Sequence, residues 1–260
     1  MHSQACKTKF LNPDNMASLS LKHLMGPAAL RHLDSVEREK LEAVNWLAKS
    51  VGKGCSLVEQ GEDREMISIL LSGWAFRYQT LSDGRRQILD FIFAGALVGF
   101  GSGSTSPYGV ETVTNCTIAS LSQGQFRRIL TNCPSLAIQV AERVSDSEMR
   151  AYEHMISLGR RSARERIAAL IVELTSRVQC REVDLRKYMF SLPVTQMMIG
   201  DALGLSNEHV CRTLGKLADD GVIKLDHHAL KVLDQEALAR EAGLNPDDFV
   251  PHGNALAAAA

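Results

Sequence analysis

Residues 199–214 read Ile-Gly-Asp-Ala-Leu-Gly-Leu-Ser-Asn-Glu-His-Val-Cys-Arg-Thr-Leu, and their pattern is the most informative one in the C-terminal part of the chain. Thr195, just before it, has a side chain that can cap the start of a helix, and Ser206 can cap the start of another. We therefore expect one helix beginning at Thr195 and a second over residues 207–219, joined by a turn.

The small and apolar residues of this stretch have the spacing of a helix-turn-helix motif. Gly200 is a small residue at the point where the two helices would cross, and Gly204 suits the turn between them. Val210 supplies the apolar residue that the second helix needs on its buried side. The stretch therefore predicts a helix-turn-helix.

The second predicted helix has two different faces. Residues three or four positions apart form an apolar, inward face: Val210, Leu214 and Leu217. The opposite face is reachable from outside: Glu208, Cys211, Arg212 and Gly215. Arg212 suits a bidentate contact with guanine, and Glu208 can accept a hydrogen bond from cytosine in a major groove. The alternative is a solvated ion pair between these two side chains, but the surrounding turn favours base reading.

The residues after this helix predict a β-hairpin. Residues 222–225 and 230–233 are apolar-rich runs, and Asp226-His227-His228 lies between them as a turn. A helix-turn-helix followed by a hairpin is a winged helix. We interpret the two histidines as exposed turn residues rather than metal ligands, because no cysteine lies nearby.

The chain upstream has a different pattern. From Cys55 to Ser122 it consists of short runs typical of β-strands, separated by glycines. The expected strands cover residues 67–71, 74–80 and 85–93. Asp83-Gly84 lies between two of them and suits a tight hairpin turn. Strands this short favour an antiparallel barrel or roll, and another kind of β-sandwich would give a similar pattern.

A helix predicted over residues 134–158 joins the two parts, and an amphipathic helix over 163–178 follows it. After Pro134 no proline or glycine interrupts the first of these before Gly159, and apolar residues recur with a period near 3.6. Such a stripe can pack on its own domain or on a symmetric copy of the chain, and we favour a dimer contact. Leu158 ends the stripe, and the residues expected in the contact are Leu136, Val140, Val144, Ala151 and Met155.

The composition is that of a globular protein with room for two domains: 260 residues, 45% hydrophobic, with 29 Lys and Arg against 30 Asp and Glu. We expect a cytoplasmic protein, because no run approaches the ~20 apolar residues of a membrane span and no secretory signal is recognisable. Six cysteines without a CxxC pair favour a reduced compartment. Residues 159–231 hold 12 Lys and Arg against 9 Asp and Glu, which permits a local basic face. No catalytic set is recognisable, so we expect no enzyme.

Four segments resemble the CRP/FNR family of bacterial transcription regulators, and within it the FNR/FixK branch. They are the 199–214 stretch, Leu-Ser-Asp-Gly-Arg-Arg-Gln-Ile at 81–88, Ala-Gly-Ala-Leu-Val-Gly-Phe at 94–100 and Leu-Gly-Arg-Arg-Ser-Ala at 158–163. The resemblance covers almost the whole chain. It implies an α+β fold with an N-terminal cyclic-nucleotide-binding-like β-roll, a long dimerisation helix and a C-terminal winged helix-turn-helix. It also implies three partners: double-stranded DNA, a second copy of the chain (a homodimer) and RNA polymerase.

The resemblance further implies which residues contact DNA. The family's recognition helix carries Glu-x-x-Ser-Arg for TTGAT-like half-sites, and Glu208 and Arg212 match it while Cys211 replaces the serine. The implied function is a FixK-like activator acting on palindromes resembling TTGAT-N4-ATCAA. Because oxidation of a thiol at this face would oppose docking, Cys211 is a redox candidate, with a neutral substitution as the alternative. The other expected DNA contacts are Thr195, Gln196, Ser206, Asn207, His209 and Lys216.

The family's effector sites are not matched. Cyclic-nucleotide-responsive members use a Gly-Glu-Leu segment and an Arg-Ser pair, whereas here Phe100 stands at the glutamate position and residues 104–110 contain no arginine. Cys116 matches the internal ligand of the FNR iron–sulfur cluster, but the first 50 residues contain only Cys6, and such clusters need four thiolates. We therefore expect no cofactor. The alternative is a haem- or ligand-responsive gas or redox sensor of the same family. Three histidines have no other assigned role and leave haem binding open: His23, His32 and His154.

These observations divide the chain into an N-terminal extension (1–30), a β-roll (31–133), the dimerisation helix (134–158), a winged-helix domain (159–236) and a tail (237–260). The tail ends in Asn254-Ala255-Leu256 followed by four alanines, and small apolar ends of this kind resemble those that bacterial ATP-dependent proteases engage. Such a protease is therefore an expected partner. A frayed end without a role is the alternative.

Overall fold

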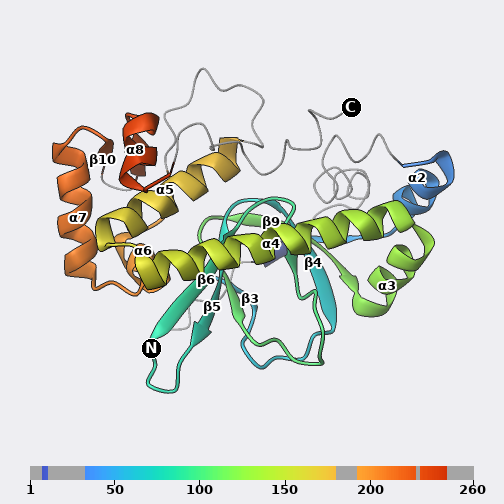
Figure 1. The fold of residues 1–260 in the computed structure, drawn as a ribbon. Helices are drawn as coiled ribbons and strands as arrows, with labels where there is room; N and C mark the ends of the chain where they lie inside the picture. Colours follow the sequence, from blue (N-terminus) through green and yellow to red (C-terminus); the bar gives the residue numbers. More distant parts are fainter. Residues whose placement is uncertain (1–7, 11–32, 180–191, 227–228, 245–260) are drawn as a thin grey trace. The chain divides into compact units, whose positions relative to one another are not determined.

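A computed structural model describes residues 8–10, 33–179, 192–226 and 229–244. The chain divides into two compact units, residues 1–147 and 148–260, and each is described by itself. The boundary lies inside one long helix, α4 (Pro134–Arg160), which Figure 1 shows as a single continuous rod. The helix predicted over 134–158 is thus confirmed, and it extends to Arg160.

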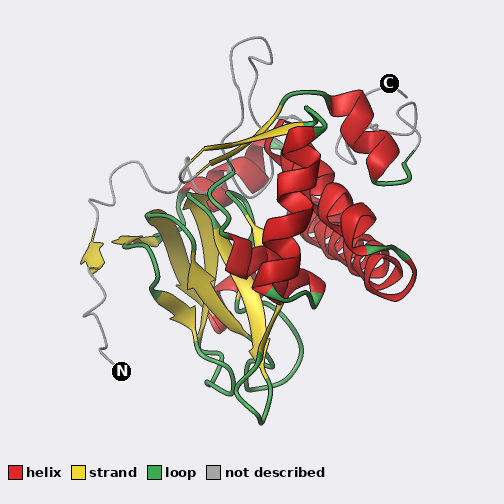
Figure 2. Cartoon of the chain, turned by 90° about the vertical axis from the view of Figure 1, so that its left-hand side faces the viewer, coloured by secondary structure: helices red, strands yellow, loops and turns green. Residues whose placement is uncertain are grey.

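Unit 1 contains two antiparallel sheets, whose strands lie side by side in Figure 2. The larger sheet has the order β1 (Thr8–Phe10), β2 (Leu47–Val51), β9 (Cys116–Ser122), β4 (Met66–Ser72) and β7 (Leu97–Val98). The smaller has the order β3 (Ser56–Val58), β8 (Gly109–Thr112), β5 (Ala75–Thr80) and β6 (Arg86–Ile92). The three strands expected from the sequence are present as β4, β5 and β6.

Successive side chains of β4 point to opposite faces of the larger sheet, and both faces are apolar there. Ile67, Ile69 and Leu71 lie in one core cluster, together with residues of three helices. Leu70, between them, belongs to a second cluster that also holds Ile92 of the smaller sheet. Since successive strand residues point to opposite faces, one face of β4 packs on the helices and the other packs inside the roll.

The helices of unit 1 are α2 (Ser35–Glu42), α3 (Gln123–Asn132) and the first part of α4. Ser122 and Gln125 form a capping box that begins α3 directly after β9. Glu37 of α2 is buried, and its carboxylate accepts a hydrogen bond of 3.1 Å from the backbone N–H of Ser135. An acidic group at a helix N-terminus satisfies an unpaired donor, so α2 fixes the start of α4.

Unit 2 is a winged helix. Its elements after α4 are α5 (Ala163–Gln179), α6 (Gln196–Leu203), α7 (Asn207–Asp219), β10 (Ile223–Asp226), β11 (Ala229–Val232) and α8 (Gln235–Glu241). Strands β10 and β11 pair antiparallel, and Leu192 forms an isolated bridge with Leu230 at the outer side of β11. The helix-turn-helix and the hairpin expected from the sequence are therefore both present.

The tight hairpin turn expected at Asp83-Gly84 is confirmed: the Gly84 N–H donates to the Leu81 carbonyl at 2.9 Å, the Leu81 N–H donates to the Arg85 carbonyl at 2.8 Å, and Gly84 has a positive φ of 85°. Two other sequence-based expectations need correction. Residues 237–241 are not tail, because they form part of α8, whose Leu238 and Ala239 are buried. Cys55 is disulfide-bonded, which does not fit the reduced compartment favoured by the cysteine pattern, whereas Cys116, Cys133 and Cys211 are free.

Some predictions fall outside the described residues: most of the extension 1–30, His227, His228 and the alanine-rich end. Within the part of the chain that the structure describes, no helix is long and apolar enough to cross a membrane.

Candidate nucleic-acid interface

Side-chain caps set the start of both helices of the helix-turn-helix. The Thr195 hydroxyl accepts from the N–H of Met198 at 3.2 Å, and the Ser206 hydroxyl accepts from that of His209, also at 3.2 Å. Both bonds satisfy donors that a helix N-terminus leaves free. These two residues therefore begin α6 and α7 as the sequence predicted.

Two glycines make the turn between the helices possible. Gly204 has a left-handed φ of 63°, which ends α6 without strain. Gly200 lies where the helices cross: a Cβ on it would lie 2.7 Å from the carbonyl oxygen of Leu205 and 3.8 Å from the Val210 side chain. Any larger residue would push α7 away from α6, so both predicted glycine roles are confirmed.

Helix α7 is held by its apolar face. The buried side chains are, as predicted, Val210, Leu214 and Leu217, each at most 1% exposed. Burial of three such side chains stabilises the position of the helix by several kcal/mol, on the order of 1.5–3 kcal/mol for each. The opposite face is consequently presented in a fixed orientation.

The opposite face of α7 carries charged side chains that are exposed to solvent. The side chain of Glu208 is 84% exposed and that of Arg212 is 58% exposed, and Cys211 beside them is exposed as well. Arg212 Nη1 donates to Glu208 Oε1 at 3.1 Å, so the ion pair considered as the alternative does form. A pair this exposed contributes about 0–1 kcal/mol, and rearranging it to meet a partner costs little.

The remaining predicted contact residues lie near the starts of α6 and α7, except Lys216, which lies near the end of α7. Thr195, Ser206, Asn207 and Lys216 are exposed, and Gln196 and His209 are partly buried. Along α7, Lys216 is the basic residue of the last turn. The structure therefore brings the predicted set together on the two helices, and all of its members are at least partly accessible.

An arginine clamp outside the predicted set supports α7 from behind. Arg164, at the start of α5, donates to both carboxylate oxygens of Glu241 and, at 2.7 Å, to Asp220 at the end of α7. The hydrogen bond from Arg164 lowers the pKa of the Glu241 carboxyl. Arg166 donates to the Leu203 carbonyl at the end of α6, at 3.4 Å. Sequence reasoning missed this clamp because its members lie 56 to 77 positions apart.

The hairpin adds a basic pair that the sequence analysis also missed. Lys224 of β10 lies directly opposite Lys231 of β11, and neither forms an ion pair with any described residue. Like charges in directly opposed strand positions are destabilising, and a bound anion would relieve that cost. The register of the predicted hairpin would have placed these two lysines opposite each other.

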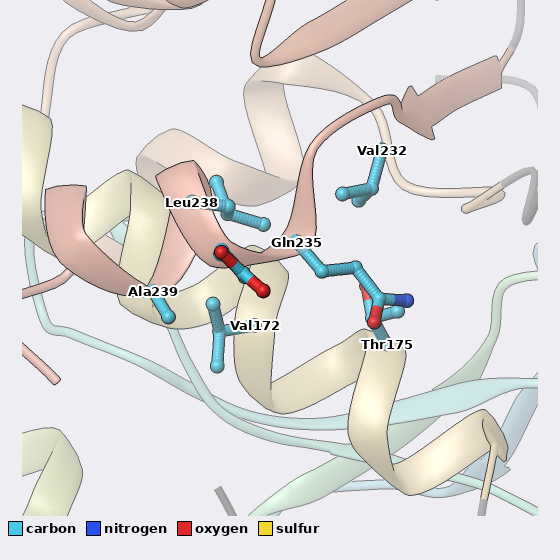
Figure 3. A pocket seen from close by; sticks show the side chains of 7 residues that line it. Val172, Thr175, Val232, Gln235, Leu238 and Ala239 are labelled. Atoms are coloured by element: carbon cyan, nitrogen blue, oxygen red, sulfur yellow. The ribbon is translucent and has the colours of Figure 1, made fainter. Parts of the chain in front are cut away.

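A small recess lies on another part of unit 2 (Figure 3), between α5, β11 and α8. Val172, Leu238 and Ala239 form its apolar wall, and all three are buried. These are the side chains through which α8 packs on α5, so the recess is part of that packing.

Comparisons with known proteins place these features in a family. Residues 48–133 match the description "Cyclic nucleotide-binding domain", and residues 165–241 match "Crp-like helix-turn-helix domain". Across nearly its whole length the chain is similar to the transcriptional activator protein FnrL of Cereibacter sphaeroides: 30% identity over 243 residues, covering 89% of this chain and 97% of FnrL. The chain belongs to the CRP/FNR family of transcription regulators.

Two further CRP/FNR relatives are FixK proteins. The nitrogen fixation regulation protein FixK of Rhizobium meliloti is 32% identical over 186 residues, which cover 71% of this chain and 82% of that protein. The solved structure of FixK2 from Bradyrhizobium japonicum superposes with a TM-score of 0.68 at 25% identity, covering 76% of this chain and 97% of FixK2. The family resemblance and the fold predicted from the sequence are thereby confirmed, and the chain is a DNA-binding transcription regulator of CRP/FNR type.

The long helix of this CRP/FNR member has two apolar stripes instead of the one predicted. Leu136 and Val140 are 1% and 3% exposed and lie in the core of their own unit, so their assignment to a dimer contact is corrected. Val144, Ala151 and Met155 are exposed, as a contact with another chain requires. A neighbouring exposed row on the same helix also holds large apolar residues that the sequence analysis missed: Ile138, Met149, Tyr152 and Ile156, between 44% and 59% exposed.

Proposed function

We propose that this protein is a FixK-like activator that binds, as a homodimer, palindromes resembling TTGAT-N4-ATCAA. The observation that carries the proposal is the fixed, outward face of α7, where Glu208 and Arg212 project from a helix anchored by three buried side chains. Arginine can read guanine O6 and N7, and a carboxylate can accept from cytosine N4. Both pairings occur in the G·C pair of the TTGAT half-site.

The exposed stripe of α4 supports the dimer. Its large apolar members are Ile138, Val144, Met149, Tyr152, Met155 and Ile156. Met149, Tyr152 and Ile156 lie three or four positions apart, and Ile138 and Val144 each lie eleven positions, about three turns, before a member on the same side, Met149 and Met155 respectively. Continuous exposed apolar surface of this kind marks a protein contact. A symmetric copy presents the same stripe, and the resulting two-fold axis matches a palindromic operator.

The residues of the roll do not fit a cyclic nucleotide, which supports activity without one. At the position expected for a ribose-binding glutamate, the Phe100 ring packs edge-on against Phe126, with centroids 5.8 Å apart. The loop that follows is bonded within the chain: Arg64 Nη1 donates to the Ser102 carbonyl at 2.8 Å, and the Ser106 hydroxyl donates to that of Tyr108 at 2.7 Å. A cyclic phosphate requires a free cation or donor there.

Cys116 does not fit an iron–sulfur ligand either. Its side chain is buried, and desolvation raises the pKa of the thiol to about 11. The sulfur lies 3.2 Å from the Trp74 carbonyl and 3.4 Å from the Thr114 carbonyl, as a protonated donor would. Cluster ligands are thiolates, so a group held in its neutral form is a poor ligand.

The haem-sensor alternative has one observation in its favour. Of the three unassigned histidines only His154 lies in the described residues, and its buried Nε2 has no hydrogen-bond partner among them. A visible absorption spectrum of the purified protein separates the alternatives: the proposal predicts no Soret or cluster band, and such a band would support the sensor.

Two partners and a location complete the proposal. RNA polymerase is the target of the activator, and the protein works in the cytoplasm. An ATP-dependent protease that engages the C-terminal alanines controls its abundance; those alanines lie outside the described residues. Replacing Ala259 and Ala260 with aspartate should slow degradation in cells and leave operator affinity unchanged.

The direct test is fluorescence anisotropy with the purified full chain, no added nucleotide, and a labelled duplex carrying the palindrome. Specific binding of a transcription regulator lies about 10³–10⁷-fold above its binding to unrelated DNA at the same salt concentration. Preference in that range supports the proposal. Equal affinity for the palindrome and a scrambled duplex would overturn it.

A further inference from the structure

Helix α7 contains a glycine that its own chain does not require. Gly215 is an interior residue of the helix Asn207–Asp219. A Cβ built on it would meet no heavy atom within 4 Å, in contrast to Gly200, which the crossing of the helices requires. Glycine in a helix interior is less favourable than alanine because it loses more backbone freedom. The missing side chain therefore leaves space for something outside the chain.

The open space lies on the predicted reading face. Gly215 follows Arg212 by three positions and Cys211 by four, so the three share one side of α7. Arg212 and Cys211 are exposed, and Gly215 itself is partly exposed. Whatever meets Arg212 from outside therefore also approaches the bare backbone at Gly215.

We infer that Gly215 is the point at which a sugar-phosphate strand of the DNA passes against the backbone of α7, and that the adjacent Lys216 supplies the charge for that contact. This inference rests on the proposed function. Recognition helices enter the major groove with their N-terminal residues, so a later turn lies at the wall of the groove, where the phosphates are. A side chain at position 215 would hold that strand away from the helix.

Charge along the helix limits how far this contact extends. Lys216 is exposed and forms no ion pair with a described residue. Asp219, one turn after Gly215, is exposed and acidic, and Asp220 is held by Arg164. A carboxylate repels a phosphate, so the strand meets α7 at Gly215 and Lys216 and leaves it before Asp219.

The test compares Gly215→Ala and Gly215→Gln with wild type. Alanine and glutamine form helices better than glycine, so both variants should melt higher, with a shift of about 2–4 °C. Both should nevertheless bind the palindrome more weakly, by about tenfold for glutamine, as expected for one lost phosphate contact. Gly124→Ala on α3, another exposed helix glycine with no neighbour within 4 Å of its Cβ position, is the matched control and should not change affinity.

The pattern of the loss distinguishes a strand contact from a base contact. Because phosphates carry no sequence information, Gly215→Gln should lower affinity by the same factor for every single-base variant of the half-site. Lys216→Ala should reduce the salt slope by about 1 in wild type and by less in the Gly215→Gln background. Wild-type affinity of a stably folded Gly215→Gln protein, or a loss confined to one base pair, would overturn the inference. Failure of wild type to bind any duplex would instead contradict the proposed function, and the inference with it.

Discussion

The guanidinium of Arg212 lies 3.1 Å from the carboxylate of Glu208, one turn earlier on the exposed face of α7. This pairing keeps two opposite charges beside each other in the absence of DNA and stabilises the helix by only a few tenths of a kcal/mol, about 0.3–0.5. Both side chains can therefore exchange this partner for bases at small cost. In isolation the same pair would be an ordinary surface ion pair, and the base-reading role that we propose for it rests on its place on the anchored second helix of the helix-turn-helix.

Replacing Arg212 with alanine should cost about 1–3 kcal/mol in operator binding and relax the base preference at one position of the half-site, because a bidentate contact is lost. Arg212→Lys is the matched control, since lysine keeps the charge without the planar fork. It should lose the same discrimination while retaining the salt dependence. The measurement is anisotropy with a panel of single-base variants. If Arg212→Ala discriminated among them as wild type does, this residue would not read a base.

A charge on the exposed stripe of α4 should separate the dimer. Met155→Asp would place an unpaired carboxylate among apolar residues of the contact, at a cost of several kcal/mol, so sedimentation should detect a monomer with weakened operator binding. Asp146→Lys changes the charge of an exposed residue of the same helix away from the stripe and should leave the dimer intact. An unchanged dimer of Met155→Asp would mean that the chains associate elsewhere.

On the same helix, a substitution at Leu136 should affect the stability of the fold and not the dimer contact. Since it is buried in the core of unit 1, Leu136→Ala should lower the free energy of unfolding by about 2–5 kcal/mol through a cavity. Differential scanning calorimetry on the full chain measures this effect. Unchanged stability would be inconsistent with the burial of Leu136.

Mild peroxide should weaken DNA binding, and dithiothreitol should restore it, because the free thiol of Cys211 is exposed on the reading face while Cys116 and Cys133 are buried. Cys211→Ser should bind the operator and resist the treatment. The comparison is a titration of operator before and after oxidation. Equal sensitivity of both proteins would assign the effect to a different cysteine.

The Arg164–Glu241 pair should make the stability of unit 2 depend on pH. The pKa of the Glu241 carboxyl is lowered in the folded protein by its bond to Arg164, relative to about 4.3 in an unfolded chain. This contribution is therefore present above the unfolded pKa and is lost as pH falls through the folded pKa. In thermal melts between pH 6 and pH 3, the melting temperature of wild type should fall more steeply with decreasing pH than that of Glu241→Gln. Parallel curves would mean that the pair contributes nothing.

The parts of this account that were predictable from sequence are those governed by local rules. The caps at Thr195 and Ser206, the left-handed Gly204 and the buried face of α7 follow from the residues themselves, and the structure has them where they were expected. The strands of the roll were also recognisable, because their alternation and their glycines are local signals.

The errors arose where long-range packing decides. The sequence pattern predicted a single apolar face on α4. In the structure the first turns of the helix bury Leu136 and Val140 in unit 1, whereas Ile138 and Tyr152 are exposed. A single periodicity cannot distinguish a helix that packs on two sides from one that packs on a single side. Residues 237–241 were placed in a tail because their packing on α5 and the clamp through Arg164 depend on residues far away in the sequence.

Binding to palindromes of altered spacing is the decisive measurement. In the proposed complex two copies of α7, related by a two-fold axis, read two half-sites about one helical turn apart. Extending the N4 spacer by five base pairs moves the half-sites to opposite sides of the duplex without changing any base of either. We predict that anisotropy will record at least a hundredfold weaker binding to the extended duplex, about 2.7 kcal/mol or more. Equal affinity for the two duplexes would contradict the account.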